Sequence, residues 1–150
     1  MMKPHFWEKA KKDLIKKDKA LGKIIKNYPG DFLFTKSDPF YTLARSIVGQ
    51  QISVSAAQAV WEKFEKKVKK VKPYDVKSMH YMKLKSCGLS RQKITYLKSL
   101  SVAFIDKKIQ PNKWKNLENE KIIDELIQIK GIGRWTAEMF LIFNLCRPDI

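Results

Sequence analysis

The sequence predicts an all-α protein, a compact array of helices formed by a chain of 150 residues. Apolar residues recur at helical spacing nearly everywhere. Capping residues precede these segments, and glycine or proline follows several of them. We find neither a convincing strand nor a long repeat. With 44% hydrophobic residues, residues 1–150 are expected to form one domain with its own core.

The first two helices are predicted between residues 6 and 30. Asp18 is placed to cap the second of them, and Pro29-Gly30 ends it. Both segments carry apolar side chains at helical spacing: Trp7, Ala10, Leu14, Leu21, Ile24 and Ile25.

A third helix is predicted in SDPFYTLARSIVGQQIS, residues 37–53. Asp38 is suited to the N-cap, Pro39 to the first helical position and Gly49 to the end of the helix. One face of this helix is expected to be buried: Phe40, Leu43, Ala44, Ile47 and Val48.

The next helix is predicted to begin after Ser53, its N-cap, and to run through Trp61 and Phe64. It ends in the basic stretch EKKVKKVKP, which Pro73 stops. A short helix is then expected around residues 79–86.

A tight joint between helices is predicted in CGLS, where Gly88 suits a left-handed position and Ser90 caps the next helix. That helix, RQKITYLKSLSVAFIDKK, is long and amphipathic. Residues 109–119 are predicted to be a polar connector. Asn119 is expected to cap EKIIDELIQI, which precedes a last apolar helix over residues 135–145.

The charge balance favours an anionic partner, because 31 basic residues face 15 acidic ones and the net charge is +16. Nucleic acid and an acidic membrane surface both fit, and so does a lysine-rich surface that is merely solvated. The N-terminal residues contain no apolar core of a signal peptide, and the hydrophobic runs are too short to span a bilayer. A protein that is not secreted is therefore expected.

The two cysteines, Cys87 and Cys146, form no CxxC pattern, which argues against a zinc or iron–sulfur site. Buried packing thiols in a reducing cytoplasm are expected instead. No cofactor is predicted.

The segment IKGIGRWTAEMF, residues 129–140, is the most informative in the chain. Gly131 and Gly133 lie two apart between helices, where glycine permits positive φ and close approach of another backbone. Ile132 between them is expected to anchor the turn in the core. Successive N–H groups at the start of the last helix would then form a site for one phosphate.

Side chains can strengthen this anion site. Thr136 can add a hydroxyl, and either Lys130 or Arg134 can add charge. The sequence does not settle which of the two basic residues points outward. The alternative is an ordinary helical hairpin with a glycine cap, but the basic charge and the flanking apolar helices favour binding to a DNA backbone.

Four motifs in order give a specific resemblance. The hairpin IKGIGRWTAEMF resembles the helix–hairpin–helix of the base-excision DNA glycosylase superfamily, in particular the DNA-3-methyladenine glycosylase II family. DPFYTLARSIVGQQIS, SCGLSRQKITYLKSL and RPDI resemble further segments of that family. The resemblance covers the chain from about residue 38 and places the helix–hairpin–helix at about 119–146.

The resemblance implies an enzyme that extrudes an alkylated purine from double-stranded DNA as a monomer. Gln51, with Gln50 beside it, would enter the minor groove and fill the gap; the alternative is a solvated polar helix terminus. The hairpin (Lys130, Gly131, Ile132, Gly133, Arg134, Thr136) would hold the backbone. A monovalent cation at the hairpin carbonyls is also implied, but no feature of the sequence shows it.

Trp135 occupies the position that is lysine in relatives that also cut the strand, so the resemblance implies a monofunctional enzyme. An indole face attracts a cationic base such as 3-methyladenine or 7-methylguanine. Met139, one turn later, would line the same pocket, whereas Phe140 and Phe143 are expected in the core. The alternative for Trp135 is also a core position.

Base release needs a carboxylate that stabilises the oxocarbenium-like sugar. The family places this aspartate a few residues after RPDI, so we expect it beyond Ile150. Asp149 matches an earlier, non-catalytic acidic position, and Glu138 is expected on the outer face of its helix. Residues 1–150 alone are therefore expected to expose apolar surface, to bind DNA weakly and to release no base.

Three other functions remain open at this level. The chain could be a non-enzymatic helix–hairpin–helix module that binds the DNA backbone. It could belong to a glycosylase for another lesion, although Trp135 argues against the strand-cleaving branches. It could also be a basic helical adaptor for acidic protein surfaces, which the ordered motifs disfavour.

Overall fold

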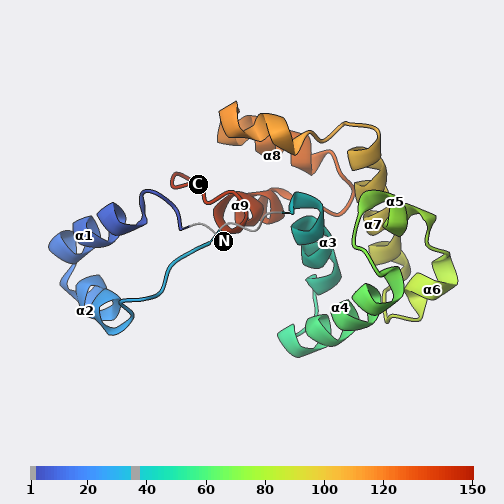
Figure 1. Ribbon diagram of the computed structural model, residues 1–150, viewed down its shortest axis with the longest axis horizontal. Coiled ribbons are helices and arrows are strands. Elements are labelled where there is room, and N and C mark those ends of the chain that lie inside the picture. The colour runs from blue at the N-terminus through green and yellow to red at the C-terminus, as the bar shows by residue number, and fades with distance from the viewer. Residues whose placement is uncertain (1–2, 35–37) are drawn as a thin grey trace.

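Figure 1 shows the computed structural model, which describes residues 3–34 and 38–150. Within these ranges all regular secondary structure is helical, which confirms the predicted all-α class. The elements are α1 (Trp7–Lys17), α2 (Lys19–Asn27), α3 (Pro39–Gly49), α4 (Val54–Val68), α5 (Pro73–Ser78), α6 (Tyr81–Lys85), α7 (Arg91–Ile105), the 3₁₀ helix η1 (Pro111–Asn116), α8 (Asn119–Ile127) and α9 (Arg134–Phe143).

Four predicted N-caps are confirmed, at Asp18, Asp38, Ser53 and Ser90. Each side chain accepts a hydrogen bond from an N–H group in the first turn of its helix, which has no partner inside the helix. The joint before α7 is also confirmed, because Gly88 has a φ of 94°.

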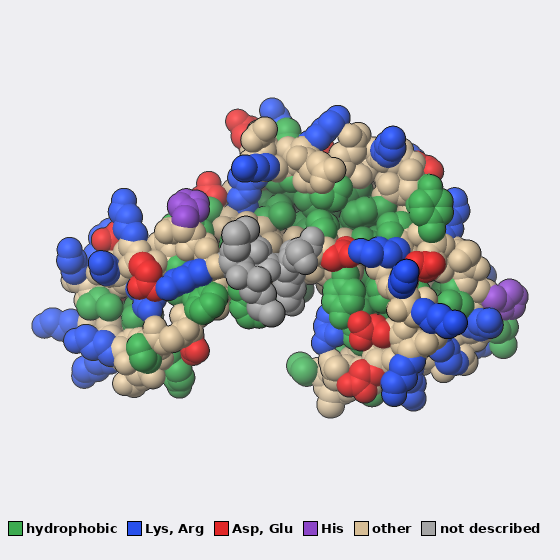
Figure 2. Space-filling model, in the orientation of Figure 1, with side chains coloured by type: hydrophobic (Ala, Val, Ile, Leu, Met, Phe, Trp, Pro, Cys, Tyr) green, Lys and Arg blue, Asp and Glu red, His purple; other side chains and the backbone are tan. Residues whose placement is uncertain are grey.

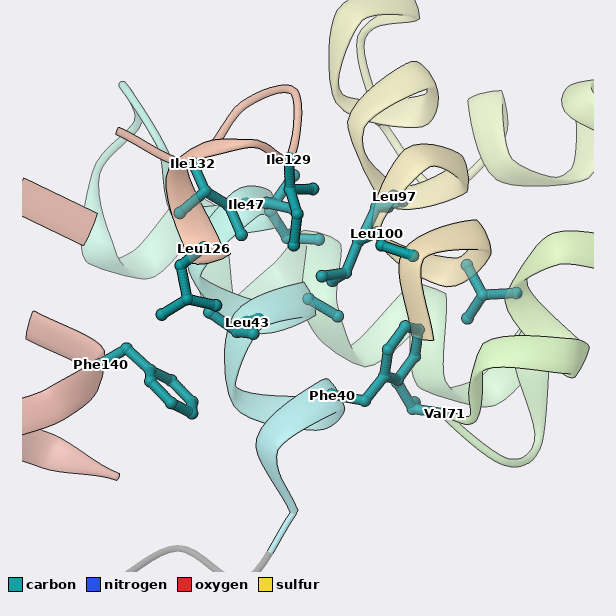
Figure 3. Packing of buried hydrophobic residues seen from close by; sticks show 14 of the residues in the cluster. Phe40, Leu43, Ile47, Val71, Leu97, Leu100, Leu126, Ile129, Ile132 and Phe140 are labelled. Atoms are coloured by element: carbon teal, nitrogen blue, oxygen red, sulfur yellow. The ribbon is translucent and has the colours of Figure 1, made fainter. Parts of the chain in front are cut away.

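The core is organised around α3, which packs against α4, α7 and α9 (Figure 3). The predicted stripe of α3 is fully buried: Phe40, Leu43, Ala44, Ile47 and Val48. Leu97 and Leu100 of α7 meet it from one side. Leu126 of α8 and Ile132 of the hairpin belong to the same cluster. The long middle helix and the hairpin are therefore fixed to the same central helix.

The structure corrects the prediction for the basic stretch after α4. The helix ends at Val68 and does not continue toward Pro73, because Lys69 adopts a φ of 63°. Neighbouring lysines on one helix face repel each other, and the turn brings Val71 back into the core. Pro73 begins an unpredicted helix, α5, and the helix expected around residues 79–86 is the shorter α6.

Residues 109–119 are also more structured than predicted. They contain η1, whose Trp114 is 1% exposed and donates from Nε1 to Glu125 Oε2 at 2.8 Å. The prediction that Asn119 caps α8 is wrong, since Glu118 occupies the N-cap without a side-chain bond. Asn119 is the first residue of the helix, and its Nδ2 donates to Asp149 Oδ1 at 3.0 Å.

The first two helices form a unit of their own. Helices α1 and α2 pack against each other and lie apart from the other helices in Figure 1. Several of their apolar side chains are exposed, including Leu14, Leu21 and Ile24. The exposed apolar surface that was expected is therefore present at the N-terminal end, and also on α9, where Trp135 and Phe143 are exposed.

Candidate functional site

A cavity of about 1060 Å³ opens where α3, α7, the hairpin and α9 meet. Its lining runs along α3 from Tyr41 to Gly49 and along α9 from Trp135 to Phe143, and the loop after α3 and the hairpin before α9 complete the wall. Of the predicted site residues, those that line the cavity are Gln50, Gln51, Gly131, Ile132, Gly133, Trp135, Thr136 and Met139. Lys130 and Arg134 do not.

The wall formed by α9 carries a row of large side chains. Trp135, Met139 and Phe143 are spaced four residues apart, so they share one helix face, and all three line the cavity. Trp135 is 71% exposed, which excludes the core alternative for this residue. Phe140 is buried as predicted, but the prediction for Phe143 is wrong, since it is 48% exposed and faces the cavity.

The loop between α3 and α4 presents its two glutamines differently. Gln50 turns toward the hairpin, and its Nε2 donates to the Gly131 carbonyl at 2.7 Å. Gln51 is exposed and has a φ of 56°, which is rare for a residue other than glycine. Gln51 is therefore the exposed member of the pair, while Gln50 links the loop to the hairpin.

Only one of the two hairpin glycines adopts the positive φ that was predicted. Gly131 has a φ of 90°, and Ile132 is buried as predicted. Gly133 has a φ of −92°, a value that residues other than glycine adopt without strain. A Cβ at this position would meet no atom within 4 Å, so neither conformation nor space requires glycine here. Helix α9 begins after Gly133 with no side-chain cap, so its first N–H groups remain open to an anion.

The charge at the hairpin is divided between two different residues. Arg134 makes a two-pronged ion pair with Glu120, at 2.6 and 3.0 Å, and its Nε donates to Glu138 Oε1 at 2.9 Å. This arginine holds the pKa of Glu120 below its usual range. Lys130 is exposed and makes no ion pair within residues 3–34 and 38–150. Lys130 can therefore bind an anionic ligand directly, whereas Arg134 must first leave its carboxylate partners.

Basic side chains do not mark the site by themselves. Figure 2 shows lysines and arginines over α1 and α2 as well as around α4 to α6. On the face seen in Figure 2, the basic side chains are therefore spread over several helices and are not gathered at one place. The cavity is located by its geometry.

Several residues that line the cavity were not predicted as site residues: Tyr41, Arg45, Lys93, Tyr96 and Phe143. The Tyr41 hydroxyl donates to Glu65 Oε1 at 2.7 Å, and burial raises its pKa. No aspartate or glutamate is among the described residues that line the cavity. The described wall therefore offers aromatic and basic groups but lacks a carboxylate.

Backbone carbonyls of the hairpin were expected to hold a monovalent cation. Two of these oxygens have donors within the chain: Gly131 accepts from Gln50, and Ile129 accepts from the Ile132 N–H at 3.0 Å. A carbonyl oxygen keeps a second lone pair, so these bonds do not prevent a cation from binding there, and the cation stays a prediction. In the described ranges, no three His, Cys, Asp or Glu side chains are grouped as metal ligands.

No helix among the described residues is long and apolar enough to cross a membrane. Cys87 and Cys146 are both free and buried, as predicted.

Comparison with known proteins identifies relatives of this site. Residues 44–139 match the profile of the HhH-GPD superfamily of base excision DNA repair proteins. This range contains the α3–α4 loop, α7, the hairpin and the first half of α9.

Among curated proteins, the chain is 38% identical to DNA-3-methyladenine glycosylase 1 of Schizosaccharomyces pombe, over 88% of this chain and 60% of the relative. It is 32% identical to the DNA-3-methyladenine glycosylase of Saccharomyces cerevisiae, over 91% of this chain and 52% of the relative. The chain thus spans between half and two thirds of their length.

A solved structure shares the fold. The S. pombe 3-methyladenine DNA glycosylase in complex with abasic DNA superposes with a TM-score of 0.81 at 35% identity, covering 95% of this chain and 72% of that one.

Proposed function

The chain belongs to the HhH-GPD superfamily of base excision DNA repair proteins, and we propose that it carries the DNA-binding and base-recognising parts of an alkylpurine DNA glycosylase. The substrates would be bases such as 3-methyladenine and 7-methylguanine in duplex DNA. One observation carries the proposal: an exposed tryptophan, Trp135, lies in the same cavity as the α3–α4 loop and the hairpin. A module that only held the backbone would need no such cavity.

The proposed binding mode assigns one task to each wall of the cavity. The open N–H groups at the start of α9 bind a phosphate, with Lys130 and Thr136 beside them. Gln51 enters the duplex and fills the space of the extruded nucleotide, which lowers the cost of extrusion. The base then stacks on Trp135, with Met139 at its edge.

The reaction is a hydrolysis. Water adds to C1′ of the sugar and gives up one proton to the carboxylate that orients it, while the bond from C1′ to the base nitrogen breaks and the base leaves with the electron pair of that bond. A base alkylated at a ring nitrogen is cationic, so it leaves as a neutral molecule. A carboxylate is needed to stabilise the sugar cation and orient the water. Since the described lining holds none, we assign the activity to the whole protein and propose that its aspartate lies outside the described cavity wall.

A second candidate function is a module that binds the DNA backbone and extrudes nothing. It is favoured by the uncapped start of α9, which is sufficient to bind a phosphate without a base pocket or a carboxylate. Binding of a methylated base in the cavity distinguishes a glycosylase from a backbone-binding module, because only a glycosylase needs Trp135 to hold the base.

Trp135→Ala in the whole protein is expected to slow release of 7-methylguanine from a duplex by roughly 2- to 30-fold, since a cation over an indole gains about 0.5–2 kcal/mol. Trp135→Phe should slow release by a smaller factor, because it keeps an aromatic face. Single-turnover release of free base measures the effect, with a neutral damaged base, hypoxanthine, as the control. Equal losses for the cationic and the neutral base would show that the ring does not recognise charge.

Glu120→Gln is expected to strengthen binding to undamaged duplex by about 3- to 10-fold, because it weakens the hold on Nη1 and Nη2 of Arg134, which can then meet a phosphate while Nε stays with Glu138. The salt dependence of log K should steepen by nearly one unit per phosphate gained. Fluorescence anisotropy at several salt concentrations measures both. Glu118→Gln removes an equal charge two residues away that makes no ion pair with any described residue; an equal gain from this control would assign the effect to net charge alone.

We also propose that the protein acts as a monomer on DNA in the cytoplasm. The two free thiols support a reducing compartment. Light scattering of the complex with a duplex would test its stoichiometry.

A further inference from the structure

Gln51 lies in an unusual backbone conformation that its own side chain does not maintain. Its φ of 56° is unfavourable for a residue with a Cβ. Its side chain makes no hydrogen bond to any other described residue. Such a conformation persists only when the surrounding structure holds it. The contacts around the loop therefore determine where Gln51 points.

One such contact comes from Lys93 on α7. Its Nζ donates to the carbonyl of Val48, 45 residues earlier, at 2.7 Å. Val48 lies in the last turn of α3, where carbonyls have no helical partner and the helix dipole is negative. Lys93 makes no ion pair with any described carboxylate, and burial lowers its pKa. A half-buried ammonium without a counter-ion is costly, and this hydrogen bond offsets the cost at the base of the loop.

Two further contacts connect the same loop and helix to the hairpin. Gln50 donates to the Gly131 carbonyl, 81 residues later, at 2.7 Å. The ring of Tyr96 lies against Gly131, so closely that a Cβ there would be 2.2 Å from Cδ2. Lys93 and Tyr96 are three residues apart on α7 and share a face. The loop, the hairpin and α7 thus form a closed triangle of contacts.

From this triangle we propose that Lys93 is a positioning residue for base extrusion, acting through the main chain that leads into Gln51. The inference rests on the proposed function, because it assumes that Gln51 fills the duplex. Without Lys93 the end of α3 and the loop can shift relative to the hairpin. The hairpin itself keeps its phosphate site. The loss therefore falls on the insertion of Gln51 and leaves affinity for the duplex nearly unchanged.

The test uses the whole protein and a duplex with a tetrahydrofuran abasic site opposite 2-aminopurine, whose fluorescence reports insertion at the gap. Lys93→Met keeps the stem of the side chain but removes the donor, and Lys93→Arg restores a donor. We expect Lys93→Met to reduce the fluorescence change at saturation by about threefold or more, with the Kd changed by less than about twofold. Lys93→Arg should recover most of the signal.

The variant Gln51→Gly tests the proposed role of Gln51 separately from the role of Lys93. If Lys93 acts through Gln51, adding Lys93→Met to Gln51→Gly changes the signal no further. Additive losses would overturn the inference, as would a normal signal in Lys93→Met. No loss in Gln51→Gly alone would instead contradict the proposed role of Gln51. Should Lys93→Met melt at a much lower temperature, Gln50→Ala breaks the triangle at another side and must give the same loss of signal.

Discussion

Gly131→Ala is expected to lower the free energy of unfolding by about 2–4 kcal/mol, combining a left-handed backbone with overpacking. The residue has a φ of 90°, and a Cβ would lie 2.2 Å from Tyr96. The ring cannot retreat freely, because Tyr96 is packed against the core. The hairpin should therefore distort, and binding to duplex DNA should fall by at least about tenfold. Thermal melting and fluorescence anisotropy measure the two effects.

The second hairpin glycine provides a matched control. Gly133 has a φ of −92°, and a Cβ there would meet nothing within 4 Å. Gly133→Ala should keep its melting temperature within a few degrees. If a phosphate approaches the start of α9, the added methyl group should still weaken DNA binding. Equal stability of the Gly131→Ala and wild-type proteins would show that the contact with Tyr96 is not tight.

Residues 1–150 alone are expected to release 7-methylguanine at least about 100- to 1000-fold more slowly than the whole protein. Losing one group that stabilises charge in the transition state commonly costs this factor. The reason is structural: the described cavity wall contains aromatic side chains, Arg45 and Lys93, but no carboxylate. Quantifying free base from a duplex with one lesion provides the measurement.

Binding must be followed in the same reactions, so that slow release is not mistaken for failure to bind. Rapid base release by residues 1–150 would contradict this account, because a carboxylate within residues 1–150 but outside the described wall would then have to act. Asp149 would be the first residue to replace in that case, although it is occupied by Asn119.

The elements predicted best were those determined by local chemistry. Asp18, Asp38, Ser53 and Ser90 cap helices because short polar side chains satisfy amides nearby in sequence. The α3 stripe follows from helical periodicity alone. The predicted N-cap at Asn119 was wrong because its side chain donates to Asp149, 30 residues away, a contact that no local pattern reveals.

The candidate site was predictable as far as its motifs were local. Trp135, Gln51 and the hairpin glycines were found from short segments and their resemblance. The contacts from Lys93 to Val48 and from Gln50 to Gly131 join residues 45 and 81 positions apart, so only the fold shows them. Phe143 was assigned to the core because apolar residues usually lie there. Its four-residue spacing from Met139 and Trp135 was the signal that could have placed it on the cavity face.

The central claim is that this cavity receives an alkylated purine that has left the duplex. The most direct measurement is release of free 7-methylguanine by the whole protein from a duplex with a single lesion, with borohydride added to trap any covalent intermediate. We predict free base, an alkali-labile abasic site and no trapped cross-link. Firm binding of the duplex without any release of base would contradict the claim and leave a module that holds the DNA backbone.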